Sequence, residues 1–216
     1  DKLTSLIGGA KLTVKNTEIK LNDEGLVDVG GIEFDQTAAT GKIAVDTGAT
    51  ISAPDIQVGS ALSGTKADLV SIKADNLTLG SSTYDNAAAL GFKEATAKNL
   101  ELVTSAASFN LQDSVTLSNV NSEKVAQKGE ISGSLNLGTS GKGLTIDGGK
   151  YEIASTDTVT LGAGVLTVEN SSGASESVLT VKGKLEIVTG AAGGTAKADG
   201  TKSKLDLTQA KISLSG

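Results

Sequence analysis

The most informative features of this sequence are the residues it lacks. Its 216 residues contain no Cys, Met, Trp or His, and all 19 basic residues are Lys, so Arg is absent as well. Without Cys there is no disulfide framework and no thiolate zinc site; without His there is neither an imidazole zinc site nor a Ser-His-Asp triad. Because these absences exclude most catalytic templates, we expect a protein that is not an enzyme and binds no cofactor.

Aromatic side chains are scarce too, at 2% of the chain: Phe34, Phe92, Phe109, Tyr84 and Tyr151. Compact cores usually draw much of their buried area from aromatics. Here the 38% of hydrophobic residues are mostly Val, Ile, Leu and Ala at regular spacing, which distinguishes the chain from disordered sequences. Such a composition predicts a core made by stacking aliphatic side chains over a long distance.

Positive charge is in deficit, because 25 acidic residues outnumber the 19 lysines and give a net charge of −6. Nucleic acids and anionic membranes attract basic surfaces, so we expect neither as a partner. No apolar run reaches the roughly 18 residues of a transmembrane helix, so no membrane-spanning segment is expected. The strand-like pattern that closely follows Asp1 suggests a chain processed or excised from a longer protein.

Short alternating runs dominate the rest of the sequence. They come in pairs of apolar-x-apolar runs, separated by breaks of two to four residues. Because alternate residues of a strand point to the same face, a period of two predicts strands rather than helices. The clearest pairs are Leu12–Val14 with Ile19–Leu21, Val27–Val29 with Ile32–Phe34, Phe109–Leu111 with Val115–Leu117, Leu144–Ile146 with Tyr151–Ile153, Val159–Leu161 with Leu166–Val168, Leu179–Val181 with Leu185–Ile187, and Leu205–Leu207 with Ile212–Leu214.

The breaks are rich in Asn, Asp and Gly, which adopt turn and left-handed conformations at little cost. Two architectures fit this pattern. We favour an all-β parallel β-solenoid, a right-handed β-helix of roughly ten irregular coils, because the repeat persists along 1–216 and the strands are short. The alternative is a set of antiparallel β-sandwich domains in which each pair of runs is a hairpin.

Longer polar segments interrupt the repeat, and we interpret them as loop excursions at about 81–96, 119–130, 169–177 and 189–204. Repeat proteins place their variation in such loops, so the excursions are the best candidates for recognition. The first is dense enough in Ala and Leu that a short helix over 84–97 is an alternative. It also carries Tyr84 and Phe92, which either form an exposed aromatic patch or pack against the solenoid.

Candidate sites for chemistry are few. Asp23-Glu24 is the one adjacent acidic pair; paired carboxylates can hydrolyse glycosides, but its polar surroundings favour a solvated corner. Segment 143–149 resembles glycine-aspartate calcium repeats faintly, yet it occurs once, which favours a turn. Sequons begin at Asn76 and Asn170, as chance predicts in a Ser/Thr-rich chain. Threonine spacing is too irregular for an ice-binding array. We assign no catalytic or metal residue, and the binding residues stay unknown.

The paired runs with polar corners, as in LTVKGKLEIV at 179–188 and FNLQDSVTLSN at 109–119, resemble the passenger domains of Gram-negative autotransporters and filamentous-haemagglutinin-type adhesins. The resemblance covers most of the chain and lies in the style of the repeat, without a family-specific motif. It implies an extracellular or bacterial cell-surface location and a role in adhesion or cell–cell self-association. The implied partners are other copies of the protein, a host-surface or extracellular-matrix ligand, or a glycan.

A second resemblance is to surface-layer proteins, which are also acidic, rich in Lys, Ser, Thr and Ala, and free of Cys. It implies assembly into a lattice, with calcium as a candidate requirement. The third interpretation is a carbohydrate-active β-helix enzyme, in which carboxylates would cluster in one groove.

Overall fold

The computed structural model describes residues 3–15, 18–34, 42–45, 48–58, 62–64, 70–80, 92–104, 106–190 and 193–215. They form two compact units. Unit 1 comprises Asp1–Thr96 with Val103–Ser105, and unit 2 comprises Ala97–Leu102 with Ala106–Gly216. Each unit is described by itself.

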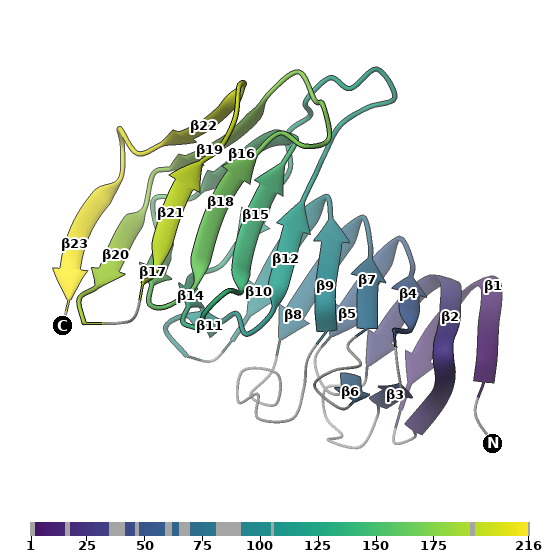
Figure 1. Ribbon diagram of the computed structural model, residues 1–216. Helices are drawn as coiled ribbons and strands as arrows, with labels where there is room; N and C mark the ends of the chain where they lie inside the picture. The colour runs from purple at the N-terminus through teal and green to yellow at the C-terminus, as the bar shows by residue number, and fades with distance from the viewer. Residues whose placement is uncertain are drawn as a thin grey trace. The chain divides into compact units, whose positions relative to one another are not determined.

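Unit 1 is built from strands that pair in parallel with strands one coil away (Figure 1). Its longest strand, β2, runs along three sides of one coil. The same step of 24 residues separates Ile19 from Ile43, Val27 from Ile51, and Ile32 from Ile56. The strands are β1 (Leu3–Val14), β2 (Glu18–Phe34), β3 (Lys42–Val45), β4 (Thr50–Ser52), β5 (Asp55–Val58), β6 (Leu62–Gly64), β7 (Val70–Lys73), β8 (Asn76–Gly80) and β9 (Phe92–Ala97).

Unit 2 repeats the three-sided arrangement with shorter strands. Three parallel stacks run through it: β12–β15–β18–β21, β11–β14–β17–β20–β23 and β16–β19–β22, and β10 pairs with β13. The strands are β10 (Asn99–Val103), β11 (Phe109–Asn110), β12 (Ser114–Leu117), β13 (Ile131–Ser132), β14 (Leu135–Leu137), β15 (Gly143–Asp147), β16 (Gly149–Ile153), β17 (Thr158–Leu161), β18 (Val165–Glu169), β19 (Ser177–Val181), β20 (Lys184–Val188), β21 (Thr195–Ala198), β22 (Ser203–Asp206) and β23 (Lys211–Ser215).

The fold is therefore an all-β parallel solenoid, as the sequence predicted, and the hairpin-based sandwich is wrong. The two runs of a sequence pair do not bond to each other; each pairs with a strand in the neighbouring coil, as Leu179 does with Leu205. The expected coil number was also wrong, since there are about seven turns rather than ten. The reason is that each coil uses three strands, whereas the unit recognised in the sequence had two.

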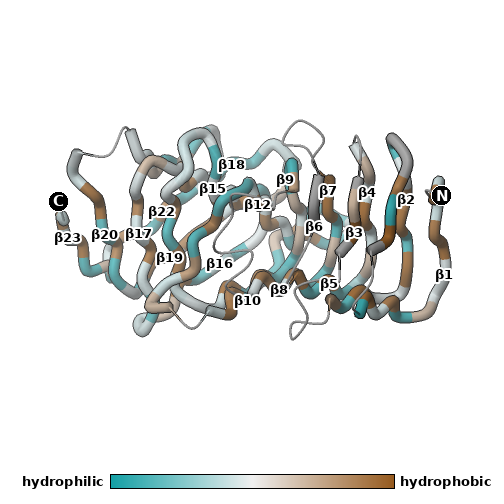
Figure 2. Tube along the Cα trace, turned by 90° about the horizontal axis from the view of Figure 1, so that it is seen from below, coloured by the Kyte–Doolittle hydropathy of each residue, from teal (hydrophilic) through white to brown (hydrophobic). Residues whose placement is uncertain are grey.

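The interior of both units consists of aliphatic ladders. In one ladder of unit 2, Phe109, Leu135, Val159 and Leu185 occupy equivalent positions in successive coils and are buried. Hydrophobic and hydrophilic residues alternate along the strands in Figure 2, so one side of each strand faces this interior. Each buried Val, Leu or Ile contributes about 1.5–3 kcal/mol, and the contribution depends on the coil above and the coil below.

Two of the expected loop excursions contain strands. Residues 92–96 belong to β9, which also contradicts a helix over 92–97; residues 81–91 lie outside the described part of the chain. The excursion at 189–204 contains β21 and begins β22. Small side chains at Ala196 and Ala198 concealed β21, yet backbone pairing with β18 does not depend on side-chain size. Between β12 and β13, and between β18 and β19, the structure has loops.

Candidate functional surface: two loops over one corner

The feature of unit 2 best suited to recognition lies where the chain turns from the β12–β15–β18 stack toward the next side. Three successive coils make this turn differently. Residues 118–130 form a long loop after β12, Gly148 alone connects β15 to β16, and residues 170–176 form a shorter loop after β18. We call the two loops, 118–130 and 170–176, the loop platform.

Gly148 lets the loops close over the corner between them. Its φ of +93° is one that side-chain-bearing residues rarely adopt. A Cβ placed there would lie 2.7 Å from Ser172 Oγ, 3.0 Å from Val120 Cγ1 and 3.1 Å from Ala174 Cβ. Both loops therefore approach this one backbone position, and only glycine fits it without displacing them.

The long loop is folded by its own hydrogen bonds. The Asn121 carboxamide oxygen accepts from the backbone N–H groups of Glu123 at 3.0 Å and Val125 at 2.9 Å. Val120 and Ala126 form an antiparallel bridge. Lys124 takes a left-handed φ of 61°, which closes the tip. Because asparagine competes well for nearby backbone groups, this sequence prefers a defined turn to an open loop.

The shorter loop is held by an aspartate of the coil beneath it. The Asp147 carboxylate accepts the backbone N–H of Ser172 at 2.9 Å and also the Ser171 hydroxyl. Within the loop, Asn170 Nδ2 donates to the Ala174 carbonyl at 2.9 Å, and Ala174 itself is buried. The first half of this loop is therefore held by charge-assisted hydrogen bonds to Asp147, and its second half by the buried side chain of Ala174.

The two loops also bond to each other across the Gly148 corner. The Ala126 N–H donates to Ser175 Oγ at 2.9 Å, and the Ser175 N–H donates to the Lys124 carbonyl at 2.7 Å. Lys150 and Glu176 form an ion pair of 2.8 Å at the base of the shorter loop. These contacts join loops from coils that are not adjacent, so the platform is one surface rather than two separate loops.

The outer side of the platform is polar with a single apolar residue. Residues 121–125 are all exposed, as are Ser171, Gly173 and Ser175, and Val125 is 43% exposed. Glu123 and Lys124 supply side chains of both charges, next to backbone that the hydrogen bonds described above hold in place. Chemically, the surface offers hydrogen-bond donors and acceptors and one hydrophobic contact.

Asp147 belongs to the segment with the faint calcium-repeat likeness, and the structure gives it another role. Its carboxylate oxygens accept hydrogen bonds from the Ser171 hydroxyl and the Ser172 backbone N–H. Among the described residues, no group of three or more His, Cys, Asp or Glu side chains is placed to hold a metal ion. The turn interpretation holds only for Gly148, because the rest of segment 143–149 is strand: it forms β15 and the first residue of β16.

The other sequence candidates are dispersed. Glu24, exposed with a φ of 57°, marks a bend within β2, and the Asp23 side chain lies outside the described residues. Asn76 Nδ2 donates to Asp55 Oδ1 at 2.6 Å on the outside of unit 1. Phe92 is fully buried, so it belongs to the core rather than to an exposed aromatic patch, while Tyr84 lies outside the described residues.

A short threonine ladder is one feature that the sequence did not reveal. Thr116, Thr145 and Thr167 occupy the same outward position on β12, β15 and β18. Their separations of 29 and 22 residues are too unequal to be recognised as a period. Thr167 is only 6% exposed and the next coil places Lys197 in register, so the ladder does not extend into a flat threonine array.

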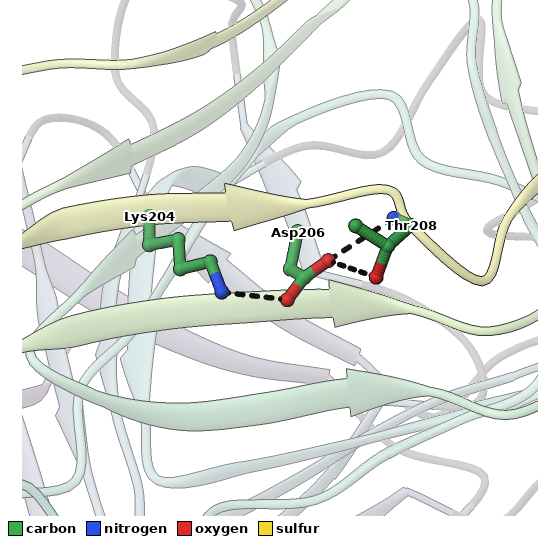
Figure 3. A network of polar contacts seen from close by, with 3 residues as sticks. All are labelled: Lys204, Asp206 and Thr208. Carbon is green, nitrogen blue, oxygen red and sulfur yellow. Dashed lines mark hydrogen bonds and ion pairs between the residues drawn. The ribbon is translucent and has the colours of Figure 1, made fainter.

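A compact polar network lies on β22, in the last coil (Figure 3). Asp206 Oδ2 accepts from Lys204 Nζ at 2.7 Å, and Oδ1 accepts from the Thr208 backbone N–H at 3.0 Å and hydroxyl at 2.7 Å. The hydrogen bond from Lys204, followed by those from Thr208, lowers the pKa of Asp206 well below its ordinary value. The network fixes the corner that leads from β22 into β23.

Comparison with known proteins adds no relative. No protein-family model matches the chain, and no curated protein or solved structure shows significant similarity to it. Among the described residues, no helix is long and apolar enough to cross a membrane.

Proposed function

We propose that this chain is a secreted or cell-surface β-solenoid that acts as an adhesive module, either in attachment to a surface ligand or in cell–cell self-association. The observation that carries the proposal is the loop platform, where two loops from non-adjacent coils bond to each other over Gly148 and expose polar groups around Val125. Loops that serve only as connections have no need of this order, whereas a binding surface gains from being pre-organised.

The solenoid beneath the platform suits a load-bearing scaffold. Its interior ladders are aliphatic, and each coil is bonded to the next through three parallel strands. The contact surface is therefore built on rigid elements, which position loop residues better than loops alone. A lattice-forming surface-layer protein would use the same scaffold, but would assemble through repeated contacts between copies instead of a ligand on the platform.

Display of the chain on the surface of a non-adherent bacterium tests the proposal. Cells carrying it should clump, or bind immobilised extracellular-matrix proteins or glycans, more than cells with an empty display vector. A triple variant, Glu123→Ala with Lys124→Ala and Val125→Ala, should abolish that gain. The matched control is Lys73→Ala, an exposed change in unit 1, which should bind like the parent.

Two outcomes would contradict the proposal. If the triple variant clumps and binds as well as the parent, the loop platform is not the contact surface. If the purified chain instead forms two-dimensional arrays with a divalent cation, seen by electron microscopy, the surface-layer interpretation replaces adhesion.

A further inference from the structure

Part of the surface of unit 2 carries no charged side chain. It is formed by β11, β14 and β17, which stack in parallel (Figure 1) and have the sequences FN, LNL and TVTL. Their inward residues are buried, and their outward residues are partly exposed amides and hydroxyls. The other two sides of the unit carry charges, such as Glu169 on one and Lys150 on the other. We call the uncharged surface the neutral face, and it consists of Asn110, Ser134, Asn136, Gly138, Thr158, Thr160 and Gly162.

The side chains of the neutral face lie in register from coil to coil. Asn110, Asn136 and Thr160 occupy equivalent outward positions on β11, β14 and β17. Asn136 Nδ2 donates to Asn110 Oδ1 at 2.9 Å, and Ser134 Oγ accepts the backbone N–H of Thr158 at 2.9 Å. These hydrogen bonds orient the polar groups in advance, which lowers the entropy cost of binding a ligand.

The next coil ends the neutral face without adding charge of one sign. Lys184 and Glu186 on β20 lie in register with Thr158 and Thr160. The two charged groups pair with each other at 2.8 Å, so their charges largely offset one another. A ligand that suits this surface is therefore itself uncharged.

Gly138 keeps the Asn136 carboxamide open to approach from outside. Its φ lies outside the left-handed range, and within 4 Å an added Cβ would meet only Asn136 Nδ2 at 3.7 Å and Oδ1 at 3.8 Å, which are ordinary contacts. Neither the backbone conformation nor packing therefore requires glycine at this exposed position. The effect of the glycine is that no side chain at 138 covers the amide.

We infer that the neutral face binds an extended, uncharged polysaccharide whose chain lies along the column of Asn110, Asn136 and Thr160. Sugar hydroxyls both donate and accept hydrogen bonds, as the amide and hydroxyl side chains of the face do. Neighbouring strands lie about 4.8 Å apart. That step is close to the length of one pyranose ring in an extended β-1,4-linked chain, so successive sugars meet successive strands.

The area of the neutral face argues against a second copy of the chain as its partner. Three strands about 4.8 Å apart, with outward positions about 6.6 Å apart along each strand, cover roughly 130 Å². A stable protein–protein contact buries about 800 Å² on each partner. A single sugar chain, in contrast, is narrow enough to make its whole contact on this face.

NMR titration of the isotope-labelled chain tests the inference. Cellohexaose, a short uncharged β-1,4-linked glucan, should shift the side-chain amide signals of Asn110 and Asn136. Maltohexaose, whose α-linked chain coils, should not shift them at the same concentration, and neither should the charged hexagalacturonate. We expect a dissociation constant in the millimolar range, because each hydrogen bond to a neutral group contributes only about 1 kcal/mol.

Two variants test the contact by different means. Gly138→Val should abolish the shifts with an unchanged circular dichroism spectrum, because its side chain stands next to the Asn136 carboxamide. Thr160→Val removes one hydroxyl at nearly constant shape and should raise the dissociation constant about 2- to 10-fold. The matched control is Thr180→Val, the same change at an outward position of β19, which should bind cellohexaose like the parent.

Four outcomes overturn the inference. They are the absence of any shift with cellohexaose, equal binding of maltohexaose or hexagalacturonate, full binding by both Gly138→Val and Thr160→Val, and shifts confined to the loop platform.

The neutral face does not depend on the proposed adhesive function, because it lies on another side of unit 2 from the loop platform. The triple platform variant, Glu123→Ala with Lys124→Ala and Val125→Ala, should bind cellohexaose like the parent. Failure of the sugar to bind therefore leaves adhesion through the platform untouched, whereas loss of clumping in the triple variant bears only on the platform.

Discussion

Replacing Gly148 by Ala should loosen the loop platform at its base. The variant forces an alanine into a φ of +93°, at a cost of about 1–3 kcal/mol for a sparsely populated backbone conformation. Its new methyl group would also meet Ala174 Cβ at 3.1 Å and Val120 Cγ1 at 3.0 Å, and such overpacking costs about 1–3 kcal/mol. Together the two effects predict a loss of about 2–6 kcal/mol.

Gly173→Ala is the matched control, because Gly173 lies in the same platform at a φ of +70° but has nothing within 4 Å of its added Cβ. It should cost only the backbone penalty of about 1–2 kcal/mol. Thermal unfolding followed by circular dichroism measures both variants, with about 2–4 °C expected per kcal/mol in a chain of this size.

Hydrogen exchange provides a local measurement of the same effect. The amides of Ala126 and Ser175 carry the bonds between the two loops, so Gly148→Ala should speed their exchange more than Gly173→Ala does. Equal stability losses in the two variants, with equal protection of these amides, would refute the idea that the loops are packed against this corner.

Three further predictions concern the solenoid. Val181→Asp should lower the free energy of unfolding by more than about 3 kcal/mol, because Val181 is fully buried and an unpaired charge there has no compensation. Chemical denaturation measures this loss, and the control Asp157→Lys should be nearly neutral in the same assay. Equal losses in the two variants would argue against a continuous core. The pKa of Asp206 is lowered in the folded state, so the contribution of this residue to stability is present above the unfolded pKa of about 3.9 and is lost as pH falls through the folded value. Asp206→Asn should therefore make stability fall less steeply as the pH is lowered, and an unchanged dependence on pH would refute this. Burial raises the pKa of Tyr151, so the contribution of this residue to stability is complete below the unfolded pKa of about 10 and is lost at higher pH. Tyr151→Phe should reduce the loss of stability at alkaline pH, while costing about 1 kcal/mol because the hydrogen bond to the Lys98 carbonyl is removed. A steeper loss of stability at alkaline pH in the variant would contradict the assignment.

The strand class was predictable from the sequence because it depends on local alternation, and the persistence of short strands along the chain favoured the parallel solenoid over hairpins. Strand β19 is an example: Ser177, Leu179 and Val181 point inward and are buried, and this alternation is visible within the five residues of the strand. The number of strands per coil was not predictable in this way. It depends on which strands pair, and the residue step between partners ranges from 22 at Leu144–Leu166 to 31 at Leu100–Ile131 in unit 2 alone.

The loop platform was predictable as a place but not as a structure. Residues 119–130 and 169–177 stand out in the sequence because they lack the alternating pattern. Nothing in either segment indicates that Ser175 bonds to Lys124 and Ala126, because that contact depends on a coil between them having a corner of one residue. The threonine ladder escaped notice for the same reason, since lateral register appears only when partner strands are known.

The solenoid separates the requirements on its interior from those on its corners. A side chain such as Leu161 must match the coils on both sides of it, because its position in the ladder is shared with Leu137 and Ile187. A corner need only return the chain to the next strand, and one side of unit 2 does so with thirteen residues at 118–130 and with Gly148 alone. Packing in the core therefore hardly constrains the length of a corner loop, and closing a longer loop costs little extra entropy. Ordered bonds between two such loops are not required by the fold, and this is the physical reason why we propose the platform as the contact surface.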